Sequence, residues 1–255
     1  MSFLHFVAIL LAGTAAGTIN TVVGSGSLIT FPTLVALGYP PLISNVSNNI
    51  GLVPGSLSGA YGYRAELAGQ RRRVMQLVPA SLVGGLAGST LLLVLPPGVF
   101  KRVVPVLIAL ALVLVVVGPT VQRKLAARRA AGGLGRTDVT PPLLGLVCAA
   151  GVYGGYFGAA QGIILIAMLG IFLDDELQRL NACKNVLAGT VNGVASIAFL
   201  VNWHHIDWAV VGTIAVGSTL GGQIGAKVGR RFNTKVLRGV IVVVGLAALV
   251  RILVK

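Results

Sequence analysis

The amino-acid sequence repeats a pattern of glycines and asparagines in its two halves, 134 to 137 positions apart. The recurring residues are, in pairs, Gly17 and Gly151, Gly24 and Gly158, Asn45 and Asn181, Asn49 and Asn185, Gly84 and Gly221, and Gly88 and Gly225. Two similar halves in an apolar chain are typical of secondary transporters, which bind their substrate where the repeats meet. The repeat therefore predicts two related halves with a site between them.

The composition indicates a membrane protein. Hydrophobic residues make up 55% of the chain and charged residues only 10%, whereas soluble domains carry about 25% charged residues. Long unbroken apolar runs such as 103–117 lack the alternation that a β-barrel needs. We predict an all-α polytopic membrane protein in a lipid bilayer. The net charge of +14 arises from basic clusters between apolar runs, a pattern that orients membrane proteins, so no nucleic-acid partner is expected.

Each half contains five apolar segments. They lie at 3–23, 26–37, 42–63, 74–95 and 101–120, and at 142–157, 160–173, 180–201, 208–228 and 236–254. Short breaks, GSGS at 24–27 and GAAQG at 158–162, separate the first two of each half, and glycine and serine there permit a sharp turn and a new helix start. We therefore predict a first repeat over 1–120 with a hairpin at 3–37, a basic cytoplasmic linker over 121–141, and a second repeat over 142–255 with a hairpin at 142–173.

The distribution of basic residues favours hairpins that enter the membrane and return. If each hairpin crossed the membrane, the chain would have eight spans, and the loops would divide their basic residues 11 against 7. If both hairpins are re-entrant, each half keeps three transmembrane helices, the halves are inverted, and the division becomes 14 against 4. The second topology predicts both termini outside. The segment 3–23 is long enough to span alone, so that choice stays open.

The chain resembles the sulfite exporter TauE/SafE family of small bacterial anion transporters. The resemblance rests on GTINTVVGSGSLITFPTLVALGYPPLISNVSNN, on GAYGYR after it, and on GVYGGYFGAAQGIILIAMLG and LNACKNVLAGTVNG in the second half. It implies export of sulfite or an organosulfonate across the inner membrane. A passive anion channel, or an importer of a related anion such as thiosulfate or sulfoacetate, is the alternative. Ser47-Asn48 and Cys183-Lys184 depart from the family pattern and leave the substrate open.

Two hairpin tips that meet at the membrane midplane would supply hydrogen-bond donors for a small anion. Helix N-termini at the tips offer free N–H groups and a positive dipole end, and asparagines one helical turn apart add amide groups. The predicted substrate-binding residues are Gly24, Ser25, Gly26, Ser27, Asn45, Asn48, Asn49, Gln161, Asn181, Lys184, Asn185 and Asn192. Hydrogen bonding between helices is the alternative role for the asparagines.

Lys184 is an ionisable residue within an apolar helix, and such residues commonly serve function in membranes. It could hold an anion as a point charge. Alternatively, its side chain could extend to the cytoplasmic surface, because Arg179 lies five residues earlier.

The acidic residues exclude some functions. All six lie in or beside predicted loops, whereas a transporter of cations or one coupled through a carboxylate needs an acid among its helices. No constellation of catalytic or metal-binding residues is present, so we expect neither an enzyme nor a bound cofactor. The expected partner is a small anion, and the sequence leaves the oligomeric state, including a homodimer, open.

Overall fold

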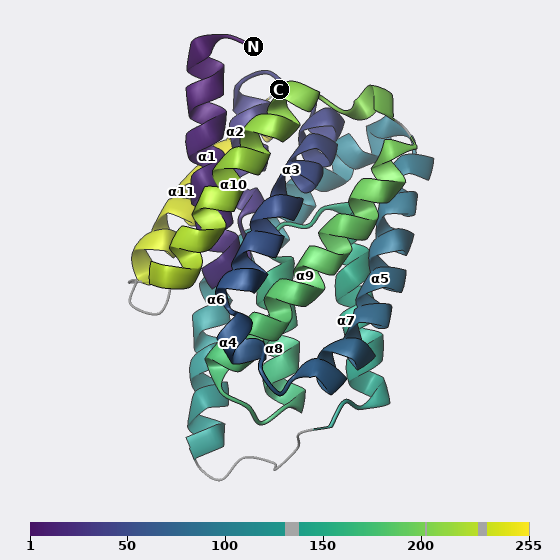
Figure 1. Cartoon of the computed structure of the whole chain (residues 1–255). Coiled ribbons are helices and arrows are strands. Elements are labelled where there is room, and N and C mark those ends of the chain that lie inside the picture. The colour runs from purple at the N-terminus through teal and green to yellow at the C-terminus, as the bar shows by residue number, and fades with distance from the viewer. Residues whose placement is uncertain (131–137, 202, 229–233, 255) are drawn as a thin grey trace.

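The structure is a computed structural model that describes residues 1–130, 138–201, 203–228 and 234–254 (Figure 1). Its elements are α1 (Phe3–Val22), α2 (Ser27–Ala36), α3 (Pro41–Gly62), α4 (Arg64–Leu67), α5 (Arg71–Val94), α6 (Pro97–Ala130), α7 (Pro141–Tyr156), α8 (Gln161–Phe172), α9 (Leu177–Leu200), the short 3-10 helix η1 (Trp203–His205), α10 (Trp208–Val228) and α11 (Thr234–Val254). Over these ranges the chain is helical and has no strand, which confirms the predicted all-α class.

Five helices are long and apolar enough to cross a membrane. They span Phe3–Val22, Arg71–Val94, Gly98–Arg128, Leu177–Leu200 and Trp208–Lys227. Large apolar side chains such as Val106, Leu82 and Val113 are exposed. Water would disfavour so much exposed apolar surface, whereas lipid tails solvate it. These features are those of a multi-pass membrane protein.

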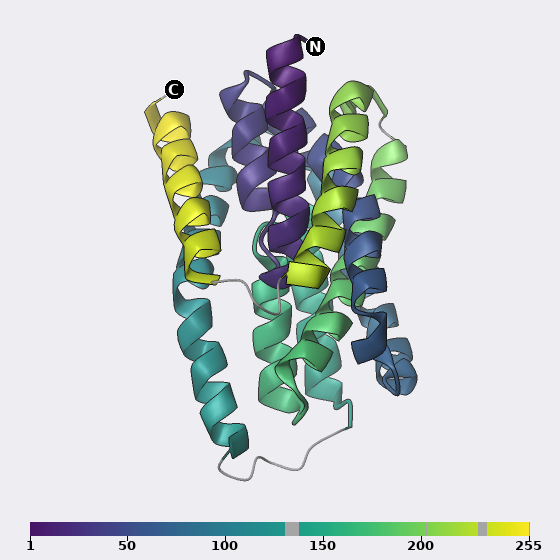
Figure 2. The same cartoon turned by 60° about the vertical axis from the view of Figure 1, so that its left-hand side comes forward.

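Two helical hairpins enter the molecule from opposite ends. Helix α1 runs inward from the end that holds both termini, and α2 returns to that end (Figures 1 and 2). Helices α7 and α8 do the same from the other end. Each turn depends on a glycine with a positive φ, 89° at Gly24 and 76° at Gly158, a conformation that other L-residues adopt only with strain.

The first arm of each hairpin packs against a helix from the other half of the chain. Helix α1 lies along α10, and α7 lies along α5. Glycines permit this close approach, because a Cβ at Gly221 would overlap the carbonyl oxygen of Thr14, and a Cβ at Gly84 would overlap that of Cys148. Each hairpin is thus held mainly by the half to which it does not belong.

Helix α6 extends into the segment that we predicted to be a linker. We expected the helix to end at 120 and a linker over 121–141, but α6 continues to Ala130. Residues 121–130 consist largely of Ala, Leu, Arg, Lys and Gln, which favour helix, and contain neither Gly nor Pro. The middle of the predicted linker, 131–137, lies outside the described residues, as do 202, 229–233 and 255, which fall in the predicted second repeat.

An ion-pair cluster joins α5 to the connection between α8 and α9. Arg73 Nη1 lies 2.5 Å from Asp175 Oδ2, and Arg179 Nε lies 2.8 Å from Asp175 Oδ1. The backbone N–H of Glu176 also donates to Asp175 Oδ1, at 2.8 Å. Burial raises the pKa of the Asp175 carboxyl, but the hydrogen bonds and the two guanidinium charges lower it more, so the net pKa lies below the ordinary value of 3.8.

Asp175→Asn is expected to lower the stability of the purified protein at neutral pH by about 1–2 kcal/mol, because it removes the charge that both arginines contact. A lowered pKa means that this stabilisation is present above the ordinary carboxyl pKa and is lost as the pH falls through the folded-state value. Thermal unfolding in detergent from pH 7 to pH 3 should therefore show the two proteins converging at the acid end. Glu176→Gln, an exposed neighbour, is the control. An equal difference at every pH would contradict this role of the Asp175 charge.

Candidate functional site at the hairpin tips

The tips of the two hairpins touch through their backbones in the middle of the molecule. The N–H of Gly162, at the start of α8, donates to the carbonyl oxygen of Gly24 at 3.0 Å. A Cβ on Gly24 would lie 2.5 Å from the Gly162 Cα, and a Cβ on Gly162 would lie 2.5 Å from the Gly24 Cα. Only glycine at both positions allows this contact. The tip residues Gly24, Ser25, Gly26 and Ser27, predicted from the sequence, are all buried here.

Three predicted residues of α9 bind the end of α1. Lys184 Nζ donates to the carbonyl oxygens of Asn20 at 2.9 Å and Thr21 at 3.3 Å. The Nδ2 atoms of Asn181 and Asn185 also donate to the Thr21 carbonyl, at 3.2 and 3.3 Å. The last carbonyls of a helix lack partners within it and carry the negative end of the helix dipole. The α9 side chains therefore cap α1 where the chain turns.

Lys184 does not reach the surface. Its side chain has no exposed area, and its aliphatic part lies beside Gly162, whose hypothetical Cβ would be 3.1 Å from Lys184 Cδ. The interpretation that the side chain extends to the cytoplasmic surface is therefore wrong. The reason is that the end of α1 brings two carbonyl oxygens to Lys184 inside the protein, where they accept hydrogen bonds from its ammonium group.

The predicted residues of α3 bind the hairpins in a related way. Asn45 Nδ2 donates to the carbonyl of Tyr156, the last residue of α7, at 3.0 Å. Asn48 Nδ2 donates to Ser27 Oγ at 3.1 Å, and Asn48 Oδ1 accepts from Thr30 Oγ1. Asn48 and Lys184 lie 136 positions apart, so the repeat places an amide in one half where the other has a cation. The site is therefore electrostatically asymmetric.

One predicted residue, Asn192, and one residue that was not predicted, Thr30, also make hydrogen bonds between helices. Asn192 donates to Ser56 Oγ on α3 at 3.3 Å, which is the interhelical role considered as the alternative. Thr30 lies almost one helical turn after Ser27 in the mostly apolar helix α2, and this spacing was the available signal.

Several buried polar atoms at the tips have no hydrogen-bond partner in the protein. They are Ser25 Oγ, Asn49 Oδ1, Gln161 Nε2 and Asn181 Oδ1. The residues that carry them are between 1% and 5% exposed. Buried polar atoms almost always find partners, so these atoms are available to a ligand or to water. The Ser25 hydroxyl and the Gln161 amide can both donate, as an anion requires.

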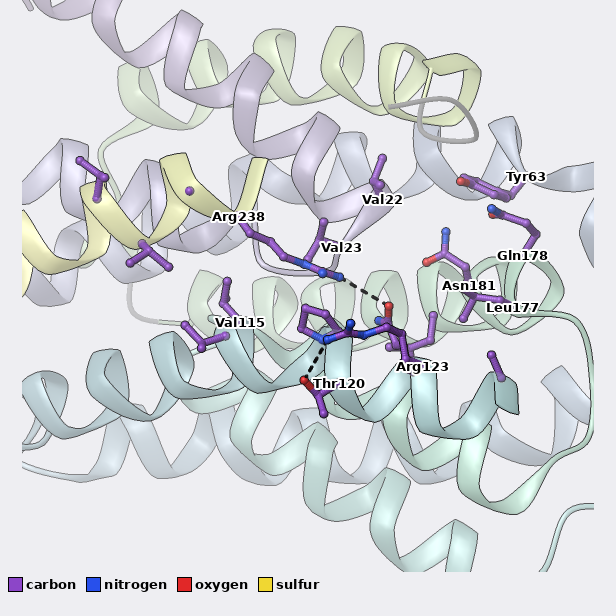
Figure 3. Close-up of a pocket in the computed structure, with 18 residues that line it drawn as sticks. Val22, Val23, Tyr63, Val115, Thr120, Arg123, Leu177, Gln178, Asn181 and Arg238 are labelled. Carbon is purple, nitrogen blue, oxygen red and sulfur yellow. Dashed lines mark hydrogen bonds between the residues drawn. The ribbon is translucent and has the colours of Figure 1, made fainter. Parts of the chain in front are cut away.

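A cavity of about 880 Å³ adjoins this region (Figure 3). Its walls come from α6, α11, the end of α1 and the first turn of α9. We call it the α6/α11 cavity. It reaches Asn181 and also Val23, the residue before Gly24. Leu177 and Tyr63 line it as well, so it lies toward the end of the molecule that carries the connections at 63–70 and 173–176.

Metal ligands do not gather at the tips. Within the described ranges, no group of three or more His, Cys, Asp or Glu side chains could hold a metal ion. The chemistry available at this site is hydrogen bonding by amides, hydroxyls and N–H groups together with one buried ammonium group.

Known proteins resemble this chain over nearly its whole length. The family model described as sulfite exporter TauE/SafE matches residues 9–252. A probable membrane transporter protein of Haemophilus influenzae is 26% identical over 231 residues, which cover 91% of this chain and 88% of the relative. The probable membrane transporter protein YfcA of Escherichia coli is 26% identical over 250 residues, covering 96% and 86%. A probable membrane transporter protein of a Sinorhizobium species is 26% identical over 255 residues, covering 98% and 93%.

Proposed function

Because the chain belongs to the sulfite exporter TauE/SafE family, we propose that it is a secondary transporter that exports a small sulfur-containing anion, sulfite or an organosulfonate, across the bacterial inner membrane. The names of its relatives support membrane transport. The observation that carries the proposal is the contact of the two hairpin tips, where a buried lysine and unpartnered polar atoms surround the joined backbones.

The chemistry of the tips suits an anion that must bind and then leave. Helix α8 begins at the tip, so the positive end of its dipole faces the site. The first N–H groups of α8 already donate to the carbonyls of Gly158, Gly24 and Ala160, so the donors left for an anion are side chains such as Ser25 and Gln161. Lys184 adds one positive charge, and its present partners are neutral carbonyls. An anion there would meet one full charge and several neutral donors. This arrangement compensates for the hydration that the anion loses on binding. It does so without several strong ion pairs, which would prevent release of the anion.

The two halves form inverted repeats in the membrane under this proposal. Each consists of a re-entrant hairpin and three transmembrane helices, α3, α5 and α6 in the first repeat over 1–120 and α9, α10 and α11 in the second over 142–255. The α6/α11 cavity then opens toward the side of the basic loops, which is the cytoplasm by the positive-inside rule. Under this proposal, the anion enters the α6/α11 cavity from the cytoplasm.

This orientation places both termini on the outer side of the inner membrane. A cysteine at Ser2→Cys should react with a membrane-impermeant maleimide in cells whose inner membrane is intact. One at Arg72→Cys should react only after that membrane is permeabilised. The parent protein gives the background from Cys148 and Cys183. The opposite labelling pattern would rule out the orientation.

Transport itself is tested with purified protein in proteoliposomes. We expect saturable uptake of labelled sulfite or of methanesulfonate, above that of protein-free liposomes and inhibited by the unlabelled anion. Preferential uptake of thiosulfate or sulfoacetate would favour the alternative, an importer of such anions, and flux that does not saturate would favour a passive channel. If folded protein moved none of these anions, the proposed function would be wrong.

A further inference from the structure

Two arginines project into the α6/α11 cavity from helices in different halves of the chain. Arg123 comes from α6 and Arg238 from α11 (Figure 3). Arg238 Nη2 is 3.5 Å from Gln122 Oε1, and Arg123 Nη2 is 3.5 Å from Thr120 Oγ1. Both distances are well beyond the usual 2.9–3.0 Å of an N–H···O bond. Arg238 Nε is buried and has no partner in the protein. Both guanidinium groups are thus weakly partnered.

The described residues that line the cavity include no carboxylate. Its described lining consists of apolar residues, amides, hydroxyls, a glycine and the two arginines. A guanidinium group stays charged in proteins, so two positive charges face one cavity with largely apolar walls. Their mutual repulsion is relieved when an anion lies between them.

The lining also defines the kind of anion. The guanidinium fork matches the oxygens of sulfonate, carboxylate or phosphate groups. Valines at 115, 116, 242 and 243 form much of the remaining wall. The volume of about 880 Å³ lies within the range of roughly 300–1,000 Å³ that is usual for small-molecule sites. A bare inorganic oxyanion would leave most of that space unfilled.

We infer that Arg123 and Arg238 form an oxyanion-binding site that receives an organic anion with an apolar portion before the anion reaches the hairpin tips. The inference rests on the proposed function, because it treats the cavity as the cytoplasmic entrance. Asn181 links the two regions, since it lines the cavity and its Nδ2 binds the end of α1 while its buried Oδ1 has no partner.

The test is equilibrium binding of benzenesulfonate to purified protein in detergent by isothermal titration calorimetry. Arg123→Gln and Arg238→Gln should each weaken binding about tenfold or more, because each removes a charge-assisted hydrogen bond. Arg128→Gln, which removes an exposed charge of α6 outside the cavity lining, should bind like the wild type. Sulfite should bind more weakly than benzenesulfonate.

Three outcomes would overturn the inference. One is unchanged binding in Arg238→Gln, and another is equal weakening in Arg128→Gln. The third concerns the source of the oxyanion, since an anionic lipid headgroup shares this chemistry. If phosphatidylglycerol in nanodiscs displaces benzenesulfonate where phosphatidylcholine does not, the site holds lipid rather than a free anion. Equal binding in both lipids supports the inference.

Failure of the transport proposal would look different. Calorimetry detects binding without any flux. Arginine-dependent binding combined with no uptake of any anion would overturn the proposed function and leave the binding site in place. Uptake that persists with unchanged affinity in both arginine variants would overturn the site and leave transport in place.

Discussion

Lys184→Gln is expected to abolish most anion uptake while the protein remains folded. A cation and an anion about 4 Å apart attract each other by roughly 4 kcal/mol at the effective dielectric of a protein, so loss of the charge should reduce the initial rate of uptake by up to about a thousandfold. Glutamine keeps an N–H donor for the carbonyl of Asn20 or Thr21, which keeps the end of α1 partly capped. Uptake per folded protein in proteoliposomes measures the effect.

The matched control is Lys227→Gln, which removes the same charge from an exposed position near the end of α10. Its uptake should match that of the wild type. A purely structural role for Lys184 gives a different result, namely a lower thermal midpoint in Lys184→Gln with uptake per folded protein within twofold of the wild type. That result would contradict a contact between Lys184 and the anion.

Gly162→Ala should separate the two hairpin tips and remove transport. The new Cβ would lie 2.5 Å from the Gly24 Cα, and backbone cannot move aside as a flexible side chain can. Overpacking of this kind costs about 1–3 kcal/mol or more, whereas replacing a helical glycine by alanine gains about 1 kcal/mol. The steric cost therefore dominates. We expect a thermal midpoint lower by several degrees and uptake reduced more than tenfold.

Gly193→Ala is the matched control for this substitution. Gly193 lies within α9, and nothing lies within 4 Å of its hypothetical Cβ. That variant should be as stable as the wild type or slightly more stable, with normal uptake. If Gly162→Ala behaved like Gly193→Ala, the tip contact would not be needed for stability or transport.

The sequence predicted the parts of the site that depend on local chemistry. Glycine-rich breaks predicted the turns at Gly24 and Gly158. The spacing of the asparagines predicted one polar face on each of α3 and α9, and in the structure Asn45 and Asn181 on these faces bind the hairpins. The partners of these residues could not be predicted. That Lys184 caps the end of α1 depends on how two segments more than 160 residues apart in the sequence pack together.

The α6/α11 cavity illustrates what local pattern cannot reveal. Arg238 belongs to an apolar helix in the sequence, and Arg123 belongs to a basic run that we interpreted as linker. Only the continuation of α6 to Ala130 and its packing beside α11 bring both arginines to one cavity. Thr30 is a simpler case, because its bond to Asn48 requires α2 to fold back against α3.

Under the proposed function, an anion crosses the membrane between the hairpin tips and carries its charge with it. The most direct test is accumulation of the transported anion in proteoliposomes under an imposed membrane potential. A potential of 100 mV acts on a single charge with about 2.3 kcal/mol. An inside-positive potential of that size should therefore raise the equilibrium accumulation of a monovalent anion by up to about fiftyfold, and an inside-negative potential should lower it. Accumulation that is the same at both potentials would contradict the claim.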